Sequence, residues 1–350
     1  MYGLPNMAAQ KFGNPSNELD HVGRAYLSIL LLASQDDLLI PYNNTGTPQT
    51  FTIPLGENTF ELTNRLEAQG IIRNANAFRN FLEYSGMDKT IQAGEYKLSS
   101  GMTSLQVASK LQDSTPDDIK FSILPGWRSE EIAAALPTSG LNISPEAFLK
   151  TINVPPMELG VSLGGGEITS FEGFLYPDIY NFPREITAEE FIARTTENFQ
   201  LKVGNDLIDG FNQHGLSMHQ AVILASIIQR ESILEEEAPI IASVFLNRIA
   251  KGQKLESDPT VQYAIGYNHD QETWWTNPIS SDNLLFDSPY NTYIYAGLPP
   301  GPISNPGLNA IRAIAYPANT NFLYFRATCD GSGGHSFAET FEEHLANECQ

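Results

Sequence analysis

A carboxylate in the second half of the chain lies at a position where folding alone would favour an apolar side chain. In the segment ASIIQRES (225–232), Glu231 follows Ile227 and Ile228 by four and three positions. On a helix this spacing places the carboxyl on the same face as the two isoleucines. Apolar neighbours and the C-terminal end of the helix dipole both raise the pKa of a carboxyl there. Such a group can act as a general acid near neutral pH, although an ion pair with a nearby arginine would also explain it.

The helix that carries Glu231 is predicted to be buried on all sides. Ser217 and Gln220 have the spacing of a capping box, and residues 221–228 are all apolar or small. A helix without a polar face belongs in a protein core. The sequence therefore predicts a buried helix with an acid near its C-terminal end.

A second helix is predicted directly after Glu231. Its first turn contains Glu235–Glu237 and Pro239, and Gly252 follows its last apolar residue. Acids at a helix N-terminus are favoured by the helix dipole, so we interpret Glu235–Glu237 in this way.

Composition argues against several classes of function. The 350 residues carry a formal net charge of −21, which would repel nucleic acid and anionic lipid. No H-E-x-x-H or C-x-x-C motif occurs, so neither a metal site nor a redox site is expected. Cys329 and Cys349 are compatible with a disulfide or with two free thiols. The apolar run 25–33 is too short to cross a bilayer and predicts a buried or amphipathic helix, without a signal peptide or anchor in this chain.

Three windows in the first half share one pattern: 51–66, 96–111 and 121–136. Each begins with a short alternation of apolar and polar residues, has glycine at its sixth place, and continues with aliphatic residues four apart. The pattern predicts a strand, a glycine turn and a helix, repeated in units that stack to share a core. With a second helix at 75–84, residues 51–98 resemble a LysM-type module, a fold associated with N-acetylglucosamine polymers.

These patterns predict an α+β protein with several domains. Residues 1–50 form a helical or linker segment, and 51–115 form the LysM-like unit. Residues 116–186 contain the third strand-helix unit and a linker rich in Pro and Gly near 137–170. Residues 187–350 are expected to form a mixed α/β catalytic domain.

Several long motifs resemble the endolytic murein transglycosylases of the MltG (YceG-like) family. They occur in order over residues 51–345, and the longest are LASIIQRES, IASVFLNRIAKGQKLESDPTVQYA, YNTYIYAGLPPGPISNPG and GGHSF. The family's catalytic glutamate lies in an E-x-E-T-like stretch, which matches Glu231, whereas Gln229 replaces the first acid. The resemblance implies a bacterial enzyme on the extracytoplasmic face of the cell membrane, held by an anchor absent from this chain. Its implied partners are peptidoglycan glycan strands and cell-wall synthases, without a cofactor.

The resemblance also implies the chemistry. A lytic transglycosylase cleaves the β-1,4 bond after N-acetylmuramic acid while that sugar's own C6 hydroxyl attacks C1, so one glutamate serves as acid and base. We expect Asn291, Tyr293 and His335 to contact the substrate, although each also fits a purely structural role. Asp258 is also placed among the candidate substrate-binding residues. Because it precedes Pro259, it is predicted to cap a helix rather than to act as a second acid.

Two other functions remain open from the residues alone. In the first, the protein is a non-catalytic peptidoglycan-binding scaffold in which Glu231 only packs. In the second, Glu231 and Asp258 or another acid form the carboxylate pair of a muramidase that uses water.

Overall fold

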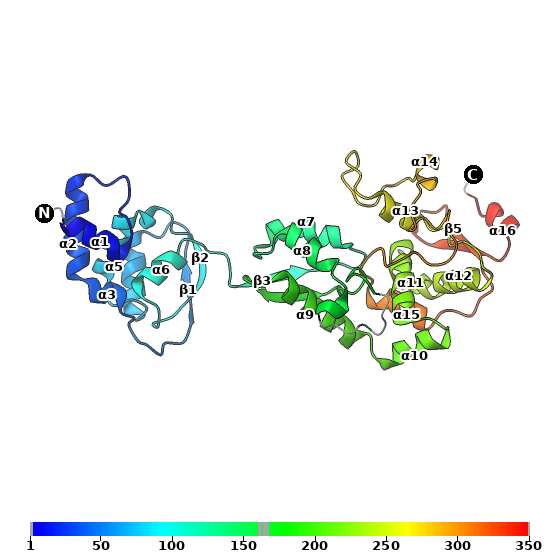
Figure 1. The fold of residues 1–350 in the computed structure, drawn as a ribbon, viewed down its shortest axis with the longest axis horizontal. Helices are drawn as coiled ribbons and strands as arrows, with labels where there is room; N and C mark the ends of the chain where they lie inside the picture. Colours follow the sequence, from blue (N-terminus) through cyan, green and yellow to red (C-terminus); the bar gives the residue numbers. More distant parts are fainter. Residues whose placement is uncertain (1–2, 160–162, 164–167, 349–350) are drawn as a thin grey trace. The chain divides into compact units, whose positions relative to one another are not determined.

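The three repeated windows form three strand-turn-helix units in the computed structural model, which describes residues 3–159, 163 and 168–348. The first consists of β1 (Gln49–Ile53) and α4 (Thr59–Ala68), and the second of β2 (Gly94–Leu98) and α6 (Ser104–Lys110). The third consists of β3 (Asp118–Ser122) and α7 (Ser129–Ser139). The predicted order of strand, turn and helix is therefore confirmed in all three (Figure 1).

The chain divides into two compact units, Met1–Asp117 and Asp118–Gln350, each with its own hydrophobic core. The first two copies of the repeat belong to the first unit and the third belongs to the second, so the three copies do not share one core. Of the four predicted segments, 1–50 and 51–115 lie in the first unit. Nearly all of 116–186, and all of 187–350, lie in the second. Helices and antiparallel strand pairs make up both units, which confirms the α+β class.

In the first unit, β1 pairs antiparallel with β2, with Phe51 opposite Tyr96. Between them the chain forms α4, α5 (Ala75–Ser85) and η1 (Met87–Lys89), in the predicted order of strand, helix, helix and strand. The N-terminal residues form α1 (Gly3–Phe12), α2 (His21–Ala33) and α3 (Gln35–Leu39). Helix α2 packs on α5, and α3 packs on α6, so this segment is part of the unit's core.

Helix α2 contains the predicted apolar run. Leu27 and Leu31 are buried, whereas Val22, Tyr26 and Ile29 are exposed, so the helix is amphipathic as predicted. Among the described residues, no helix has both the length and the apolar character needed to cross a membrane.

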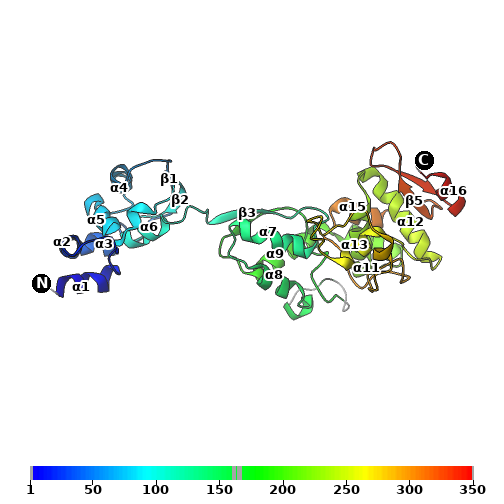
Figure 2. The same cartoon turned by 90° about the horizontal axis from the view of Figure 1, so that it is seen from above.

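The second unit begins with a two-stranded sheet and three helices. Strand β3 pairs antiparallel with β4 (Ile179–Pro183), and α7, α8 (Pro145–Ile152) and α9 (Ala188–Lys202) lie beside this sheet (Figure 2). The predicted linker near 137–170 is wrong over its first part. It contains α8, which Ser144 caps and which buries Phe148 and Ile152, followed by η2 (Pro156–Leu159).

Helix α11 (Met218–Glu231) is the centre of the remaining part. Residues 221–228 are all buried, and the helix packs on α10 (Asn205–Gln213), α12 (Ala238–Ala250), α13 (Asp258–Ile265) and α15 (Leu308–Ala315). The capping box of Ser217 and Gln220 is present as predicted. Beyond this core lie η3 (Glu235–Glu237), α14 (Ser281–Leu284), the antiparallel pair β5 (Tyr324–Ala327) and β6 (His335–Ala338), and α16 (Phe341–Ala346). The pairing of Cys329 with Cys349 is not described, because Cys349 lies outside the described residues.

The repeated glycines adopt one backbone conformation in two of the three copies. Gly56 and Gly126 have φ values of 84° and 85°, whereas Gly101 is not in the left-handed region. A side chain at Gly56 would meet open space, so any cost of a substitution there comes from the backbone alone.

We expect Gly56→Ala to lower the free energy of unfolding of the first unit by about 1 kcal/mol, since alanine disfavours positive φ. Denaturant unfolding measures this difference. Gly3→Ala, at a glycine without positive φ whose added Cβ would also meet open space, is the control and should not lower this free energy; equal costs at both positions would contradict the assigned turn geometry.

Candidate active site

The carboxyl of Glu231 lies at the wall of a cavity of about 540 Å³. Helix α11 ends at this residue because Ser232 turns to an extended conformation, with φ −89° and ψ 117°. Glu231 is half-buried and is one of the residues that line this cavity. Twelve other residues line it: Arg248, Leu255, Glu256, Asp258, Tyr293, Tyr324, Phe325, Arg326, Ala327, His335, Phe341 and His344.

The environment of Glu231 raises its pKa to about 7. Burial is the largest cause, and the negative charge of Asp258 adds to it. A hydrogen bond from the Ser257 hydroxyl and the positive charge of Arg230 lower the pKa in part. The raised pKa predicted from the sequence is thus supported by the geometry, and the carboxyl keeps its proton for a substantial fraction of the time near neutral pH.

Ser257 contacts Glu231 directly, which the sequence patterns did not predict. Its Oγ donates a hydrogen bond of 2.5 Å to Oε1 of Glu231. The serine is buried and fixed from both sides: its N–H donates to Oγ1 of Thr292 at 3.0 Å, and its carbonyl accepts from Oγ1 of Thr260 at 2.6 Å. The sequence feature that could have indicated this residue is its position directly before Asp258 and Pro259, where a helix N-cap is expected.

Asp258 does not cap a helix, so the sequence prediction is wrong on this point. Ser257 occupies the N-cap position of α13, and Asp258 is the first helical residue. Its Oδ1 accepts a hydrogen bond of 2.6 Å from the Tyr293 hydroxyl, and both side chains line the cavity. Burial, together with this acid, raises the pKa of Tyr293 and keeps it a donor. Asp258 therefore contributes a second carboxylate to the cavity that contains Glu231.

Asn291 is fully buried and does not line the cavity. Its Nδ2 donates to the carbonyls of Leu284 and Phe286 at 3.0 and 2.9 Å. Its Oδ1 accepts from the N–H of Tyr293 at 2.9 Å. The expected contact with substrate is not available to this amide, which instead holds the turn that presents Tyr293.

His335 lies at the start of β6 and lines the cavity. Its Nδ1 lies 2.7 Å from Oε2 of Glu237, and its N–H donates to Oε1 of the same carboxylate at 2.9 Å. Glu237 is thus engaged by a residue of the cavity, which the interpretation of Glu235–Glu237 as helix-dipole acids did not include.

Arg248 anchors the loop in front of Ser257. Its Nε donates to the carbonyl of Lys254 at 2.7 Å, and its Nη1 donates to the carbonyl of Leu323 at 3.0 Å. Its guanidinium also forms an ion pair with Glu256, which has a φ of +52°. This buried arginine connects α12, the loop that carries Ser257 and the start of β5.

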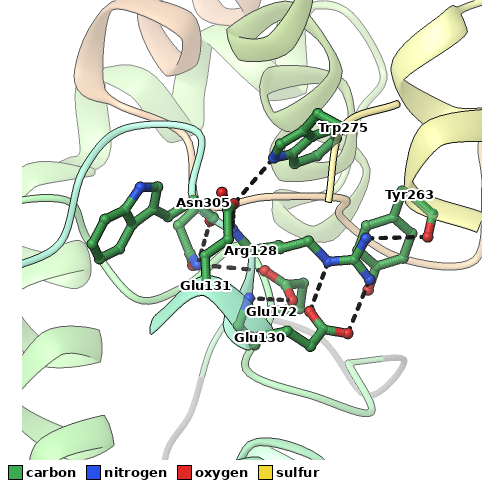
Figure 3. A network of polar contacts seen from close by, with 9 residues as sticks. Arg128, Glu130, Glu131, Glu172, Tyr263, Trp275 and Asn305 are labelled. Atoms are coloured by element: carbon green, nitrogen blue, oxygen red, sulfur yellow. Dashed lines mark hydrogen bonds and ion pairs between the residues drawn. The ribbon is translucent and has the colours of Figure 1, made fainter. Parts of the chain in front are cut away.

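A second polar network joins the strand-helix part of this unit to the part that carries Glu231 (Figure 3). Glu172 is buried, accepts a hydrogen bond of 3.0 Å from the N–H of Ser129, and is approached by Nδ2 of Asn305 at 3.4 Å. Arg128 forms two contacts with Glu130, at 2.7 and 2.9 Å, and stacks on Tyr263 at 4.0 Å. Burial raises the pKa of Glu172 to about 7.

This network also reaches the residue next to Glu231. The indole N–H of Trp275 donates to Glu131 at 3.1 Å, and Arg230 stacks on the Trp275 ring at 3.8 Å. Gln229 accepts a hydrogen bond of 2.9 Å from the N–H of Gly307, which fixes the end of α11 on its other side.

Comparison with known proteins assigns the family. Residues 51–350 match the YceG-like family. The chain belongs to this family. A YceG-like protein from Listeria monocytogenes has a crystal structure with a TM-score of 0.57 and 30% sequence identity, covering 87% of this chain and all of that one.

Two relatives carry the name endolytic murein transglycosylase. The one from Bacillus subtilis is 29% identical over 316 residues, which is 86% of this chain and 84% of the relative. The one from Streptococcus pneumoniae strain R6 is 26% identical over 342 residues, which is 89% of this chain and 60% of the relative.

We expect Ser257→Ala to raise the pKa of Glu231 above its present value of about 7, because the hydroxyl stabilises the ionised carboxylate. Infrared titration of the carboxyl band measures the change. The exposed Ser109→Ala serves as control. A pKa that falls in the Ser257 variant would contradict the assigned hydrogen bond.

We expect Glu172 to reduce stability as the pH rises. Its pKa is raised from 4.5 to about 7, so the folded state holds the proton more tightly than the unfolded state. The contribution of the protonated Glu172 carboxyl to the free energy of unfolding is fully present below pH 4.5. It decreases as the pH rises towards 7, by about 3 kcal/mol at most. Unfolding curves from pH 4 to 8 should be less pH-dependent for Glu172→Gln than for the exposed control Glu197→Gln. Identical pH dependence in both variants would contradict the assignment.

Proposed function

We propose that this YceG-like protein is an endolytic lytic transglycosylase with Glu231 as its general acid and base. It would cleave the β-1,4 bond between N-acetylmuramic acid and N-acetylglucosamine in glycan strands and leave 1,6-anhydro ends. The observation that carries the proposal is the carboxyl of Glu231, with its pKa raised to about 7, at the wall of a cavity of about 540 Å³. The names of the two relatives support the same substrate and reaction.

The reaction begins with protonated Glu231. Its proton passes to the oxygen of the scissile bond as that oxygen separates from C1 of the muramyl sugar. The C6 hydroxyl of the same sugar then attacks C1, and its proton returns to the glutamate. Since the nucleophile belongs to the substrate, the protein must mainly position the sugar and stabilise the positive charge that develops at C1.

Asp258 and Tyr293 fit the second of these tasks. The carboxylate of Asp258 lines the cavity, and the Tyr293 hydroxyl fixes one of its oxygens at 2.6 Å. A fixed negative charge in a partly dehydrated cavity stabilises an oxocarbenium-like transition state more than it would in water. In this proposal Asp258 acts through its charge.

The position of Asp258 in the cavity also favours a second candidate function, a muramidase that uses two carboxylates. Asp258 shares the cavity with Glu231 and is not engaged in capping, so it could activate water or attack the sugar. The two reactions leave different ends on the glycan. Transglycosylation leaves anhydro ends, whereas hydrolysis leaves reducing ends.

The proposal also includes a role for the first unit and a cellular location. The order of strand, helix, helix and strand in the first unit supports a LysM-like role in holding N-acetylglucosamine polymers. The enzyme would work on the extracytoplasmic face of a bacterial cell membrane, next to cell-wall synthases. Protein from membrane fractions and co-purification with a synthase would test this location.

We expect Glu231→Gln to retain the fold and to lose glycan cleavage by at least about 10²-fold, because the amide cannot deliver a proton. Mass spectrometry of digested peptidoglycan should show anhydro ends with the unmodified protein and none with the variant. Glu236→Gln, at an exposed neighbour, is the matched control. Normal cleavage by folded Glu231→Gln would exclude Glu231 as the acid, and no cleavage by the unmodified protein would favour a scaffold.

We expect kcat/KM for cleavage to decrease at alkaline pH with a midpoint near 7, because Glu231 must be protonated to act as the acid. Each pH unit above the midpoint should lower the rate about tenfold. A rate that stays constant from pH 6 to 9 would contradict this role.

A further inference from the structure

Arg326 is a positively charged residue in the wall of the cavity that contains Glu231. We propose that its guanidinium binds a carboxylate of the stem peptide, which the muramyl sugar of peptidoglycan carries on its lactyl group. The enzyme would then cleave strands that carry anionic peptides in preference to strands without them. The inference rests on the function proposed above and adds the part of the substrate that lies beyond the sugar.

The basic side of the cavity is distinct from the side that carries the catalytic carboxyl. The charge of Asp258 acts on Glu231, where it adds to the raised pKa. The charges of Arg326 and Arg248 act on His344, where they add to burial in lowering the pKa of the ring. The cavity therefore has an acidic side, where the bond is cleaved in the proposed reaction, and a basic side around β5 and α16.

Among the described residues that line the cavity, Arg326 is the basic group that can offer its charge to a ligand. Arg248 is occupied, because its guanidinium holds two backbone carbonyls and the carboxylate of Glu256. His344 has a lowered pKa, so its ring is mainly neutral near pH 7. His335 already lies 2.7 Å from a carboxylate of η3.

The contacts of Arg326 orient its guanidinium and leave it available. Its Nη1 donates to the carbonyl of His344 at 3.3 Å, and its Nη2 lies 3.5 Å from the carboxylate of Glu348. The Glu348 side chain is 65% exposed, and a solvent-exposed ion pair of this kind contributes little free energy. A substrate carboxylate can therefore replace Glu348, and the planar guanidinium can hold both of its oxygens.

Aromatic rings beside Arg326 provide an apolar wall for the rest of a peptide. Arg326 follows Tyr324 by two positions in β5, so the two side chains point to the same face of the strand. The Tyr324 ring lies 5.8 Å from the Phe341 ring and stacks on His344 at 5.3 Å. All three rings line the cavity, and Phe341 is 54% exposed. Alanine methyl groups of a stem peptide can pack on this surface while a carboxylate pairs with the arginine.

The attachment point of the peptide allows this contact. The lactyl group belongs to the same muramyl sugar whose C1 is attacked, so a sugar bound at Glu231 brings its peptide to the cavity. A peptide extends by about 3.4 Å per residue, so a few residues can reach β5 across a cavity of about 540 Å³. The chain has 41 acidic and 20 basic residues, so most of its surface repels an anionic peptide and the basic side attracts it.

The test compares three forms of uncrosslinked glycan strands. The first carries its peptides, the second carries the same peptides with their carboxylates converted to carboxamides, and the third has lost its peptides to an amidase and retains the lactyl carboxylate. The unmodified protein should cleave the first form with a kcat/KM about tenfold higher than the other two, because one charge-assisted hydrogen bond is lost in each of them. The difference should appear mainly in KM.

Arg326→Gln should remove this preference, so that kcat/KM for the peptide-bearing and the carboxamide strands differs by less than about twofold. Arg194→Gln, at an exposed arginine of α9 that does not line the cavity, should keep the preference. If Arg326→Gln does not fold, the comparison of the first two strand forms with the unmodified protein still decides the matter.

The possible results separate this inference from the proposed function. Equal cleavage of peptide-bearing and carboxamide strands by the unmodified protein, or an unchanged preference in folded Arg326→Gln, would overturn the role of Arg326 and leave that of Glu231 intact. Equal cleavage of peptide-bearing and peptide-free strands would identify the lactyl carboxylate as the ligand and overturn the peptide assignment. Reducing ends, or no cleavage, from the unmodified protein would overturn the transglycosylase proposal. The same strand comparison, made on rates or on binding affinities, would then still decide the role of Arg326.

Discussion

The place of the Glu231 carboxyl at the end of a buried core helix is the constraint on which the rest of the site depends. The eight consecutive buried residues 221–228 fix α11 in the core of the second unit, and the helix carries Glu231 at its end. The carboxyl there loses hydration, and this loss is the largest cause of its raised pKa. The buried Ser257 offsets part of that cost with one short hydrogen bond.

The surrounding elements can be understood as supports for this one group. Arg248 holds the loop that carries Ser257, and Thr260 and Thr292 hold the serine itself. On the other side of α11, Gln229 is fixed by Gly307, and Arg230 is stacked on Trp275. Glu131 of the third strand-helix unit accepts a hydrogen bond from Trp275, on which Arg230 stacks, and this ties that unit to the same helix end (Figure 3). The third copy of the repeat therefore serves the site as scaffold.

Local patterns in the sequence were enough to predict much of this fold. A capping box and apolar periodicity located α11, and the repeated window located three strand-helix units, because these signals act within one or two turns of chain. Helix α8 was missed because the Pro and Gly residues after it dominated the composition of 137–170. The grouping into two units was also missed, since it depends on long-range packing that a repeat does not encode.

The part of the site that depends on local spacing was also predicted from the sequence. The stripe that carries Glu231 lies on one helix, so its raised pKa could be inferred from spacing. The roles of Ser257 and Glu237 could not, because their partners Glu231 and His335 lie 26 and 98 positions away in the chain. The predicted start of α13 was wrong by one position. The N-cap is Ser257, so Asp258 is the first helical residue and its carboxylate lines the cavity.

Titration of the Glu231 carboxyl itself tests the central claim most directly. Carbon-13 NMR of protein labelled at glutamate carboxyls can follow this group, with Glu231→Gln to assign its signal and Glu172→Gln to remove the other buried carboxyl with a raised pKa. The account predicts a midpoint near 7 for Glu231. A midpoint near 4.5, the value of an unperturbed glutamate, would show that the residue is ionised at neutral pH and would contradict its role as the acid.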